Sequence, residues 1–338
     1  MGNQTQFLLD SGFWGWLYKL LYPVEWLMTQ IMSLFHKFLV MLGMNPVGFS
    51  WVMSIVFLVL VVQACIFPLF YKTMKSMRKM QEIQPKMMRI QNKYKNKTDQ
   101  ASKEAMQREM MKLYQDNDAN PMGSCLPMLI QGPVFMCMFY TLSAIPYIAR
   151  GTFRNGGTLG AFDIPTAKEF TSTTVFGVNV ADNFTTAAVH GKVVIAIFVA
   201  LMCFCLWFMQ YNSMKRNMAQ SAANKQTERM QKMMLWMVPI MYIFSGVAMP
   251  FAVLVYWLTN NICNLLRSIW QIRFFPTPGS PAAEDKEKRD HKRENERRAK
   301  AGLPSLEEEE LEKARKAAES REKNGYQRHQ PSRKKKKK

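Results

Sequence analysis

The sequence predicts an all-α integral membrane protein with five transmembrane helices, a cytoplasmic helical hairpin and an amphipathic helix in the outer membrane interface. Three observations support this class: long stretches without charge, basic loops that alternate with weakly charged ones, and a charged C-terminal part with few large apolar residues. The 338 residues carry a net charge of +20. A balance this basic favours an acidic partner, such as nucleic acid or anionic lipid head groups.

Transmembrane helices are expected where about 20 mostly apolar residues follow one another, because the hydrocarbon core is ~30 Å thick and a helix rises ~1.5 Å per residue. Four such stretches contain no Asp, Glu, Lys or Arg. The last of them, residues 233–266, is too long for one span and carries Gly246 and a Met249-Pro250 pair, so we divide it into two helices joined by a tight turn. The five predicted spans are 49–71, 125–149, 193–214, 233–248 and 251–270.

Residues 1–48 are predicted to stay outside the cytoplasm. Within them, residues 16–42 contain Lys19, Pro23 and Glu25, and their apolar residues recur at helical spacing. This pattern favours an amphipathic helix that lies in the membrane interface over a sixth span. The first eleven residues lack the basic segment and the cleavage site of a signal peptide, so none is expected.

The loops assign one orientation to all five spans. Residues 72–118 and 215–232 are rich in Lys and Arg, whereas residues 150–192 carry few basic side chains. Positive charges concentrate on the cytoplasmic side of membrane proteins. We therefore expect a multi-pass protein of the plasma membrane, with its N-terminus outside, a core over residues 49–275 and its C-terminus in the cytoplasm.

The cytoplasmic loop 72–118 is helical by propensity, because it is rich in Lys, Met, Gln and Glu. Residues 96–99 divide it into two arms, which predicts an antiparallel hairpin, and Pro85 should kink or restart the first arm. Its many methionines either pack the two arms together or offer an adaptable surface to apolar segments of a bound partner. The residues assigned to partner contact are Met77, Met80, Gln84, Pro85 and Met88.

Residues 276–338 are too charged and too poor in apolar side chains to bury a core, so we expect a disordered cytoplasmic tail or a solvated helix. The basic end of this tail is either a solubilising terminus or a contact for the phosphates of anionic lipid or ribosomal RNA. The residues assigned to this contact are Arg333, Lys334, Lys335, Lys336, Lys337 and Lys338.

The sequence lacks the side-chain patterns of an enzyme. It has no HExxH pair, G-x-S-x-G elbow or P-loop, and no Asp or Glu lies within the five predicted spans. Because buried ionisable residues do the work of proton-coupled carriers and intramembrane proteases, this argues against pumps, ion-coupled carriers and hydrolases. The six cysteines lack CxxC spacing and the four histidines are scattered, so we expect no metal, no cofactor and no catalytic residue.

Polar side chains within the predicted spans are the candidates for a polar interior. Amides are costly in hydrocarbon unless they are hydrogen-bonded or wetted. They can join neighbouring helices through hydrogen bonds or line a water-containing cavity, and the two roles are compatible. The residues concerned are Gln63, Gln131, Gln210, Thr259, Asn260 and Asn261.

Three sequence blocks follow this topology in register. The first is Phe67-Pro68-Leu69 followed by M-Q-E-I-Q-P-K from Met80, the second is N-P-M-G-S-C-L-P-M-L-I-Q-G-P-V-F from Asn120, and the third is P-F-A-V-L-V-Y-W from Pro250 with Asn260. Together they resemble the YidC/Oxa/Alb family of membrane protein insertases over about residues 14–275. One block alone would be weak support, but three in the right order with the matching topology are specific.

The resemblance implies a five-helix fold that inserts and helps to fold newly made membrane proteins, alone or with the Sec translocon. A hydrophilic groove would open to the cytoplasm and to lipid and close on the outer side. The hairpin would first meet the client, and the basic tail would help to dock the ribosome. The implied partners are nascent membrane proteins, the Sec translocon, the ribosome and anionic lipids, and the missing large periplasmic domain implies a monoderm bacterium. The implied groove residues are Gln63, Gln131, Gln210, Tyr256, Trp257 and Asn260, although the spacing of Tyr256 and Trp257 alone favours packing aromatics.

The sequence departs from the family at one groove position. The family usually carries an arginine five residues before the proline of its first span, and counting back from Pro68 gives Gln63. An amide can hold water but cannot attract an acidic client, so the resemblance carries over the groove without its charge. Two other functions remain as alternatives: a small-solute channel, and a scaffold for translocon or membrane-complex assembly.

Overall fold

The structure, a computed structural model, describes residues 12–120, 122, 126–155, 157–218 and 225–323. The chain forms two compact units, Met1–Ala282 and Ala283–Lys338, and each is described by itself. Nearly all of the described secondary structure is helical, and the described residues contain a single two-stranded sheet. The predicted helical class is confirmed, whereas the number of spans and the location of the loops relative to the membrane stay predictions.

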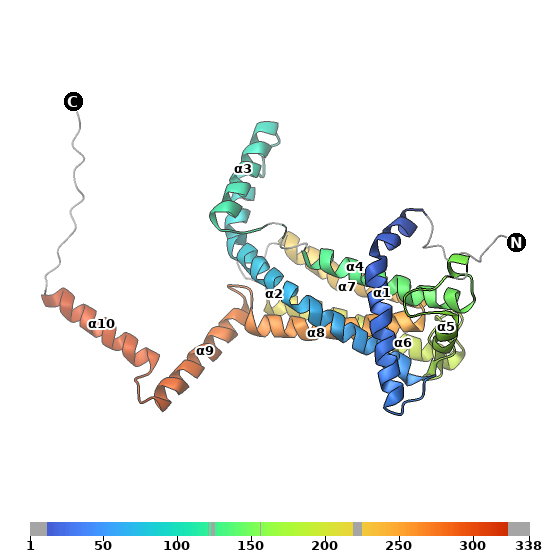
Figure 1. The fold of residues 1–338 in the computed structure, drawn as a ribbon. Helices are drawn as coiled ribbons and strands as arrows, with labels where there is room; N and C mark the ends of the chain where they lie inside the picture. The colour runs from blue at the N-terminus through green and yellow to red at the C-terminus, as the bar shows by residue number, and fades with distance from the viewer. Residues whose placement is uncertain (1–11, 121, 123–125, 156, 219–224, 324–338) are drawn as a thin grey trace. The chain divides into compact units, whose positions relative to one another are not determined.

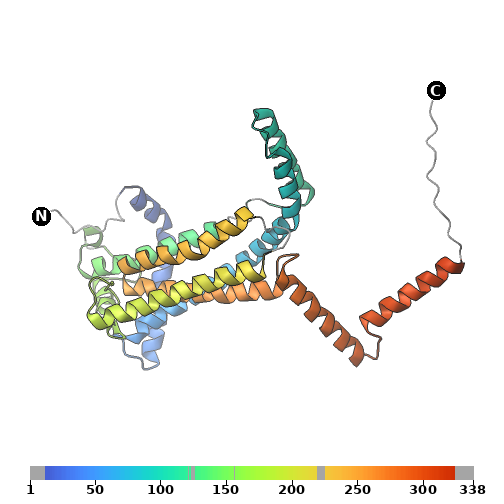
Figure 2. The ribbon, with the colours of Figure 1, turned by 180° about the vertical axis from the view of Figure 1, so that it is seen from behind.

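Five long helices of the first unit lie side by side, and α1 (Gly12–Met41) crosses them (Figures 1 and 2). Three of the five are long and apolar enough to cross a membrane, namely α2, α6 and the part Met128–Ala149 of α4. The other two, α7 and α8, occupy the positions of the fourth and fifth predicted spans. Helix α8 carries two adjacent polar side chains, Asn260 and Asn261, within its apolar sequence. The five helices are α2 (Phe49–Tyr94), α4 (Leu126–Ala149), α6 (Val189–Arg216), α7 (Lys225–Ala248) and α8 (Phe251–Phe274).

A small end cap, residues 153–182, covers one end of the bundle. Its strands form an antiparallel hairpin whose turn has positive φ values at Phe176 (55°) and Gly177 (74°), as two-residue hairpin turns require. Phe162 and Phe170 are fully buried, and both ring centroids lie 5.4 Å from that of Trp51 at the start of α2. The elements of the cap are η3 (Phe153–Asn155), α5 (Ile164–Thr171), β1 (Thr174–Val175) and β2 (Val178–Asn179).

The turn between α7 and α8 lies where the sequence predicted it. Pro250 takes the position before the first helical residue, where the helix does not need its missing N–H. The N–H of Phe251 donates to the carbonyl of Asp182 (2.7 Å), and the N–H of Ala252 donates to that of Val180 (2.9 Å). These bonds satisfy N–H groups that the start of a helix leaves free, and they anchor α8 to the end cap.

The bundle is tightly packed at the end cap and looser towards its other end. All residues from 251 to 257 of α8 are buried, as are most residues from 50 to 59 of α2 and from 137 to 149 of α4. In contrast, no residue from 61 to 69 of α2 and no residue from 128 to 136 of α4 is buried. The side chains of this second half are therefore more accessible to water, lipid or a partner.

Helix α1 buries both polar and apolar side chains against the bundle and exposes a set of apolar ones on its surface. Glu25 and His36 are buried, whereas Leu34, Phe38 and Met41 are mostly exposed. The predicted helix is present over residues 12–41, and the predicted apolar stripe lies on its outside. A surface of this kind suits a helix that rests against lipid.

Two helical arms occupy the region of the predicted hairpin. The first arm is the continuation of α2, which runs as one helix through Pro68 and Pro85 to Tyr94. Of the two outcomes expected at Pro85, the restart does not occur and the kink stays a prediction. A proline removes only one backbone hydrogen bond, and the turns before and after it hold the helix together. The second arm, α3 (Gln100–Asp116), begins where predicted, because the Asp99 carboxylate accepts the N–H of Ser102 at 2.8 Å.

The two arms are joined near the turn between them. Lys93 Nζ lies 2.5 Å from Glu109 Oε1, and the Tyr94 hydroxyl donates to the same oxygen at 2.9 Å. These hydrogen bonds, with that of Lys93 first, lower the pKa of Glu109. The arms are therefore antiparallel, as the residues at 96–99 predicted.

The second unit contains helices where a disordered tail was one expectation. The structure has the solvated-helix alternative, with α9 (Pro281–Lys300) and α10 (Leu306–Lys323). The boundary between the units falls at Ala283 rather than at 276, since Thr277 and Ser280 are buried in the first unit. Residues 281–323 contain equal numbers of basic and acidic side chains, so local ion pairs can stabilise both helices.

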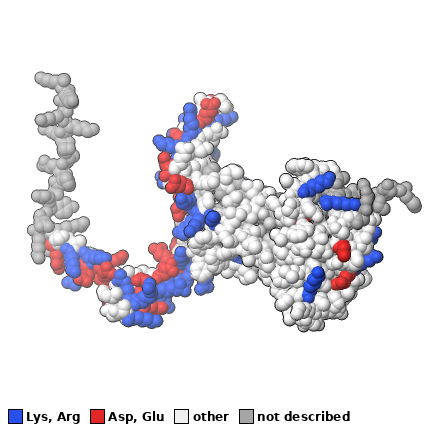
Figure 3. Space-filling view, in the orientation of Figure 1, with Lys and Arg blue, Asp and Glu red and all other residues white. Residues whose placement is uncertain are grey.

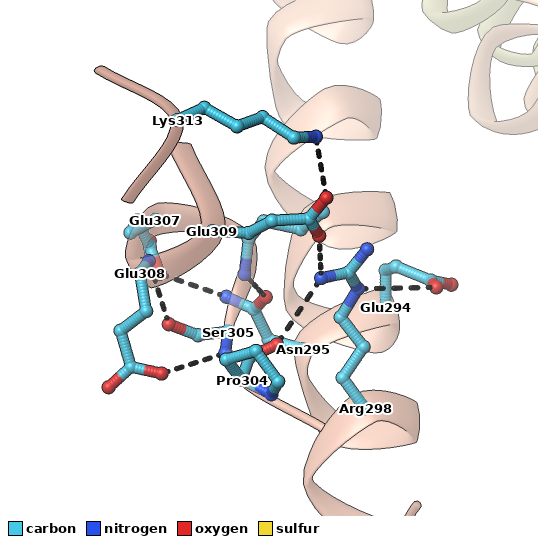
Figure 4. A network of polar contacts seen from close by, with 10 residues as sticks. Glu294, Asn295, Arg298, Pro304, Ser305, Glu307, Glu308, Glu309 and Lys313 are labelled. Carbon is cyan, nitrogen blue, oxygen red and sulfur yellow. Dashed lines mark hydrogen bonds and ion pairs between the residues drawn. The ribbon is translucent and has the colours of Figure 1, made fainter. Parts of the chain in front are cut away.

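A network of polar contacts fixes the turn between α9 and α10 (Figure 4). Glu309 of α10 accepts from Arg298 of α9 and from Lys313 one turn further along α10, each at 2.5 Å. The Asn295 side chain accepts the N–H of Leu306 at 3.0 Å, which satisfies a free donor at the start of α10. This turn depends on charge, because few apolar side chains are available there.

We expect the α9–α10 turn to weaken in acid. Hydrogen bonds from Lys313 and Arg298 lower the pKa of Glu309 to about 2. The ionised Glu309 carboxylate therefore stabilises the turn fully above its ordinary pKa of 4.5, and this stabilisation is lost as the pH falls towards 2. Hydrogen-exchange protection of α10 amides in the full chain should therefore decrease over this range. Glu309→Gln should show the low protection already at neutral pH, whereas the exposed Glu310→Gln should resemble the wild type. Equal protection in all three proteins would contradict this role.

Candidate functional site: a polar cluster inside the bundle

The side chain of Asn260 connects three helices. Its Oδ1 accepts a hydrogen bond from Gln63 Nε2 of α2 at 2.5 Å and a longer one from Gln131 Nε2 of α4 at 3.4 Å. Asn260 is only 9 % exposed, and the two glutamines are half-buried. These three residues form an amide cluster at the level where the packed end of the bundle gives way to the looser one.

Arg267 of α8 joins the amide cluster. Its Nη1 donates to Gln63 Oε1 at 3.2 Å, and its Nη2 donates to Oδ1 of Asn264 on the preceding turn. Its Cζ lies 3.6 Å from the centroid of the Phe70 ring, which is a close cation–π contact. Asn260, Asn264 and Arg267 share one face of α8, because they are four and seven residues apart. A positive charge is therefore present at the cluster, and it comes from α8 and not from position 63 of α2.

Sequence reasoning missed Arg267 although it lies within the predicted fifth span, 251–270. Acidic residues inside spans mark proton carriers, whereas a single basic residue near the end of a span is common and has no such meaning. The spacing of Asn260, Asn264 and Arg267 was the available signal, because it places two amides and a guanidinium on one helix face.

Tyr256 and Trp257 lie one turn before the amide cluster, and both are buried. Trp257 stacks with Phe135 at a centroid distance of 5.5 Å and lies 5.2 Å from Tyr242, so it packs within an aromatic group. The Tyr256 hydroxyl and Gln131 Oε1 are buried and have no hydrogen-bond partner among the described residues. Buried polar atoms of this kind are commonly satisfied by water.

Among the described residues, the remaining predicted site residues make no hydrogen bond with the amide cluster. Gln210 of α6 is half-buried and has no side-chain hydrogen bond within the described part of the chain. The predicted hairpin contacts are also half-buried, which suits methionines that pack between the arms. The segment 333–338 and Cys125, the first residue of the second predicted span, lie outside the described residues. The hairpin contacts are Met77, Met80, Gln84, Pro85 and Met88.

The polar cluster offers hydrogen bonds and one positive charge. Its amides donate and accept hydrogen bonds and can hold water, and its arginine can bind an anion. Across the described residues, no group of three or more His, Cys, Asp or Glu side chains is arranged to hold a metal ion. Long apolar helices around such a cluster define a multi-pass membrane protein whose interior can receive polar groups.

Comparison with known proteins identifies the family. Residues 42–277 match the family described as 60Kd inner membrane protein, and the chain belongs to this family. A relative from Bifidobacterium longum is 74% identical over 99% of this chain and 100% of its own length. Relatives from Tropheryma whipplei (34% identical, 82% of this chain and 92% of the relative) and Streptomyces avermitilis (34%, 77% and 59%) are more distant. All three are named membrane protein insertase YidC, and the chain is accordingly a multi-pass protein of the bacterial membrane that serves membrane protein insertion.

Proposed function

We propose that the chain inserts newly made membrane proteins by giving their polar segments a hydrated path along the amide cluster. The observation that carries this proposal is the position of the cluster, at the boundary between the packed and the looser half of the bundle. The buried Tyr256 hydroxyl and Gln131 Oε1, which have no partner among the described residues, favour water at this level. The looser half is then the groove, open to lipid and to the cytoplasm.

The orientation that suits this function has the end cap outside and the hairpin in the cytoplasm. In the first unit, the visible face of the bundle carries almost no charge along its middle, and charged side chains of both signs gather over the hairpin (Figure 3). Residues 72–118 and 215–232 both have more basic than acidic side chains, which is typical of cytoplasmic loops. In this orientation α7 and α8 complete five spans, and the apolar stripe of α1 rests in the outer interface.

The proposed mechanism lowers the free-energy barrier for moving a polar client segment across the bilayer, and it needs no covalent chemistry. Moving one charged side chain to the middle of a bilayer costs about 3 kcal/mol or more. A polar tail that enters a hydrated half-bundle crosses hydrocarbon only over the packed half, so its barrier falls. The apolar segment of the client leaves sideways into lipid, driven by burial worth ~25 cal/mol per Å². No cofactor or nucleotide takes part in this scheme.

The proposed partners follow from charge. Because residues 281–323 are balanced in charge, the excess positive charge of the C-terminal part comes after residue 323, mainly at 333–338. We assign this basic end to the ribosome or to anionic lipid, and the hairpin to the arriving client, with the Sec translocon as a further partner. The hairpin methionines contribute by packing the two arms and by their partly exposed thioethers.

Insertion of a single-spanning client into proteoliposomes that contain only this protein tests the proposed function. Protease protection of the translocated client tail should appear faster than in empty liposomes. Release of an entrapped small dye, measured in the same vesicles, distinguishes a solute channel. Insertion at the rate of empty liposomes, with the protein shown to be folded, would reject the proposal in favour of the scaffold alternative.

A further inference from the structure

We propose that a polar cavity between α1 and the end cap binds the head group of an outer-leaflet phospholipid that carries both a phosphate and an ammonium group. The cavity has a volume of about 490 Å³, which is within the range of small-ligand sites. It shares no residue with the amide cluster, so the inference goes beyond the proposed function. It takes from that proposal only the orientation, with the end cap outside.

The walls of this cavity come from three parts of the first unit. Helix α1 contributes Ser33 and Lys37, the connection between α1 and α2 contributes Pro46, and the end cap contributes Asp163 and Glu169. The positive charge thus comes from α1 and the negative charges from the facing end cap. A ligand that carries one charge of each sign matches this arrangement.

The α1 wall offers donors that the described part of the chain does not use. Ser33 is only 6 % exposed, and its hydroxyl has no hydrogen bond with a described residue. The Lys37 ammonium likewise has no hydrogen bond or ion pair with a described residue. A buried hydroxyl without a partner is costly unless water or a ligand binds it. A hydroxyl and an ammonium side by side are donors suited to the oxygens of a phosphate.

The end-cap wall offers acceptors for an ammonium group. Glu169 Oε1 accepts from Trp51 Nε1 at 3.1 Å and lies 3.4 Å from His36 Nε2. Its second oxygen, Oε2, has no partner among the described residues, so it can accept from a ligand. Asp163 lines the same wall and adds a second negative charge. Hydrogen bonds between an ammonium and a carboxylate are among the strong ones, because both groups are charged.

The two signs of charge are close without cancelling each other by contact. Lys37 and Asp163 form no ion pair. Hydrogen bonds from Thr166 are the main cause of the lowered pKa of Asp163, and the charge of Lys37 adds to them more weakly. The positive and negative sides of the cavity are therefore near neighbours that stay apart, as the phosphate and the ammonium of a zwitterionic head group do.

The position of the cavity on α1 assigns its ligand to the membrane. Ser33 and Lys37 line the cavity, and the residues directly after them, Leu34 and Phe38, are mostly exposed. Successive residues lie ~100° apart around a helix, so the cavity and the apolar stripe occupy neighbouring faces of α1. In the proposed orientation the stripe rests in the outer interface. Acyl chains can then lie along the stripe while the head group enters the cavity.

Binding of three probes to the full chain in detergent tests this inference, with native mass spectrometry as the readout of the Kd. Dihexanoyl phosphatidylethanolamine carries both charged groups, dihexanoyl phosphatidylglycerol carries the phosphate alone, and O-phosphoethanolamine carries both groups without acyl chains. The ethanolamine lipid should bind about tenfold more tightly than the glycerol lipid, the factor expected for a charge-assisted hydrogen bond. It should also bind about tenfold or more tightly than O-phosphoethanolamine, which lacks the apolar contact.

Two substitutions separate the roles of the two walls. Glu169→Gln keeps an acceptor for Trp51 and removes the charge, so the preference for the ethanolamine lipid should fall below about twofold. Lys37→Gln should weaken the binding of both lipids by about tenfold and leave the preference in place, because the phosphate is common to them. Lys19→Gln, at an exposed position of α1 outside the cavity, is the matched control and should change neither Kd.

Four outcomes would overturn the inference. Equal affinity of the wild type for the two lipids would show that the cavity does not select an ammonium. Binding of O-phosphoethanolamine as tightly as the lipid would make the cavity a site for a soluble compound. A preference retained in folded Glu169→Gln would place the ammonium elsewhere, and unchanged affinities in Lys37→Gln would do the same for the phosphate. None of these experiments measures insertion, so the proposed function is tested independently.

Discussion

Asn260→Leu should slow client insertion by about tenfold or more while the bundle stays folded. Leucine resembles asparagine in size and suits an apolar helix interface, but it removes the Oδ1 acceptor shared by Gln63 and Gln131. Leaving a buried donor without a partner costs ~1–3 kcal/mol, and two donors are affected here. The hydrated path would then be interrupted at its centre. Protease protection of a neutral client tail in proteoliposomes measures the rate.

Two other variants show whether the loss comes from the shared acceptor. Thr259→Val removes a hydroxyl that donates only to the carbonyl of Val255 in its own helix, at 2.8 Å, and should leave the rate nearly unchanged. Gln63→Leu removes one partner of Asn260 and should have an intermediate effect. If Asn260→Leu inserted the client at the wild-type rate, the amide cluster would be a helix–helix contact and not a path for polar segments.

Local sequence patterns predicted most of the helices, because each rests on interactions within a few residues. The Met249-Pro250 pair ended α7 and preceded α8, and the turn at residues 96–99 separated the two arms of the hairpin. The sequence left alternatives open where longer-range or cumulative effects decide. Helix α2 does not restart at Pro85, and α9 and α10 have the solvated-helix form of the tail although they bury almost no apolar surface. Ion pairs between helices, such as that of Arg298 with Glu309, do not follow from composition.

The candidate site was predicted in its residue types but not in its arrangement. Amides inside apolar spans predicted a polar interior, and Gln63 and Gln131 do donate hydrogen bonds to the same oxygen of Asn260. The meeting point depends on how far each helix is shifted along its neighbours, which the sequence does not encode locally. Gln210 fits the same pattern of residue type and yet makes no hydrogen bond with these residues in the described part of the chain. The spacing of Asn260, Asn264 and Arg267 in the fifth span was a local signal, but the contact of Arg267 with Gln63 of α2 depends on how the two helices pack.

Trp51→Ala should lower the free energy of unfolding by ~3–5 kcal/mol, the range for removal of a large buried aromatic side chain. Trp51 is 1 % exposed and connects three elements at the packed end of the bundle. Its ring stacks on His36 of α1 at a centroid distance of 3.7 Å, and its Nε1 donates to Glu169 Oε1 of α5 at 3.1 Å. Chemical denaturation in detergent micelles, followed by the fluorescence of the remaining tryptophans, measures the loss.

A matched substitution separates burial from the general cost of losing a tryptophan. Trp236 of α7 is 64 % exposed, so Trp236→Ala should change the free energy of unfolding by less than about 1 kcal/mol. Similar losses in both variants would mean that the end cap does not depend on Trp51. The proposed closure of the outer side depends on this packing, because α1, α2 and α5 meet around one side chain.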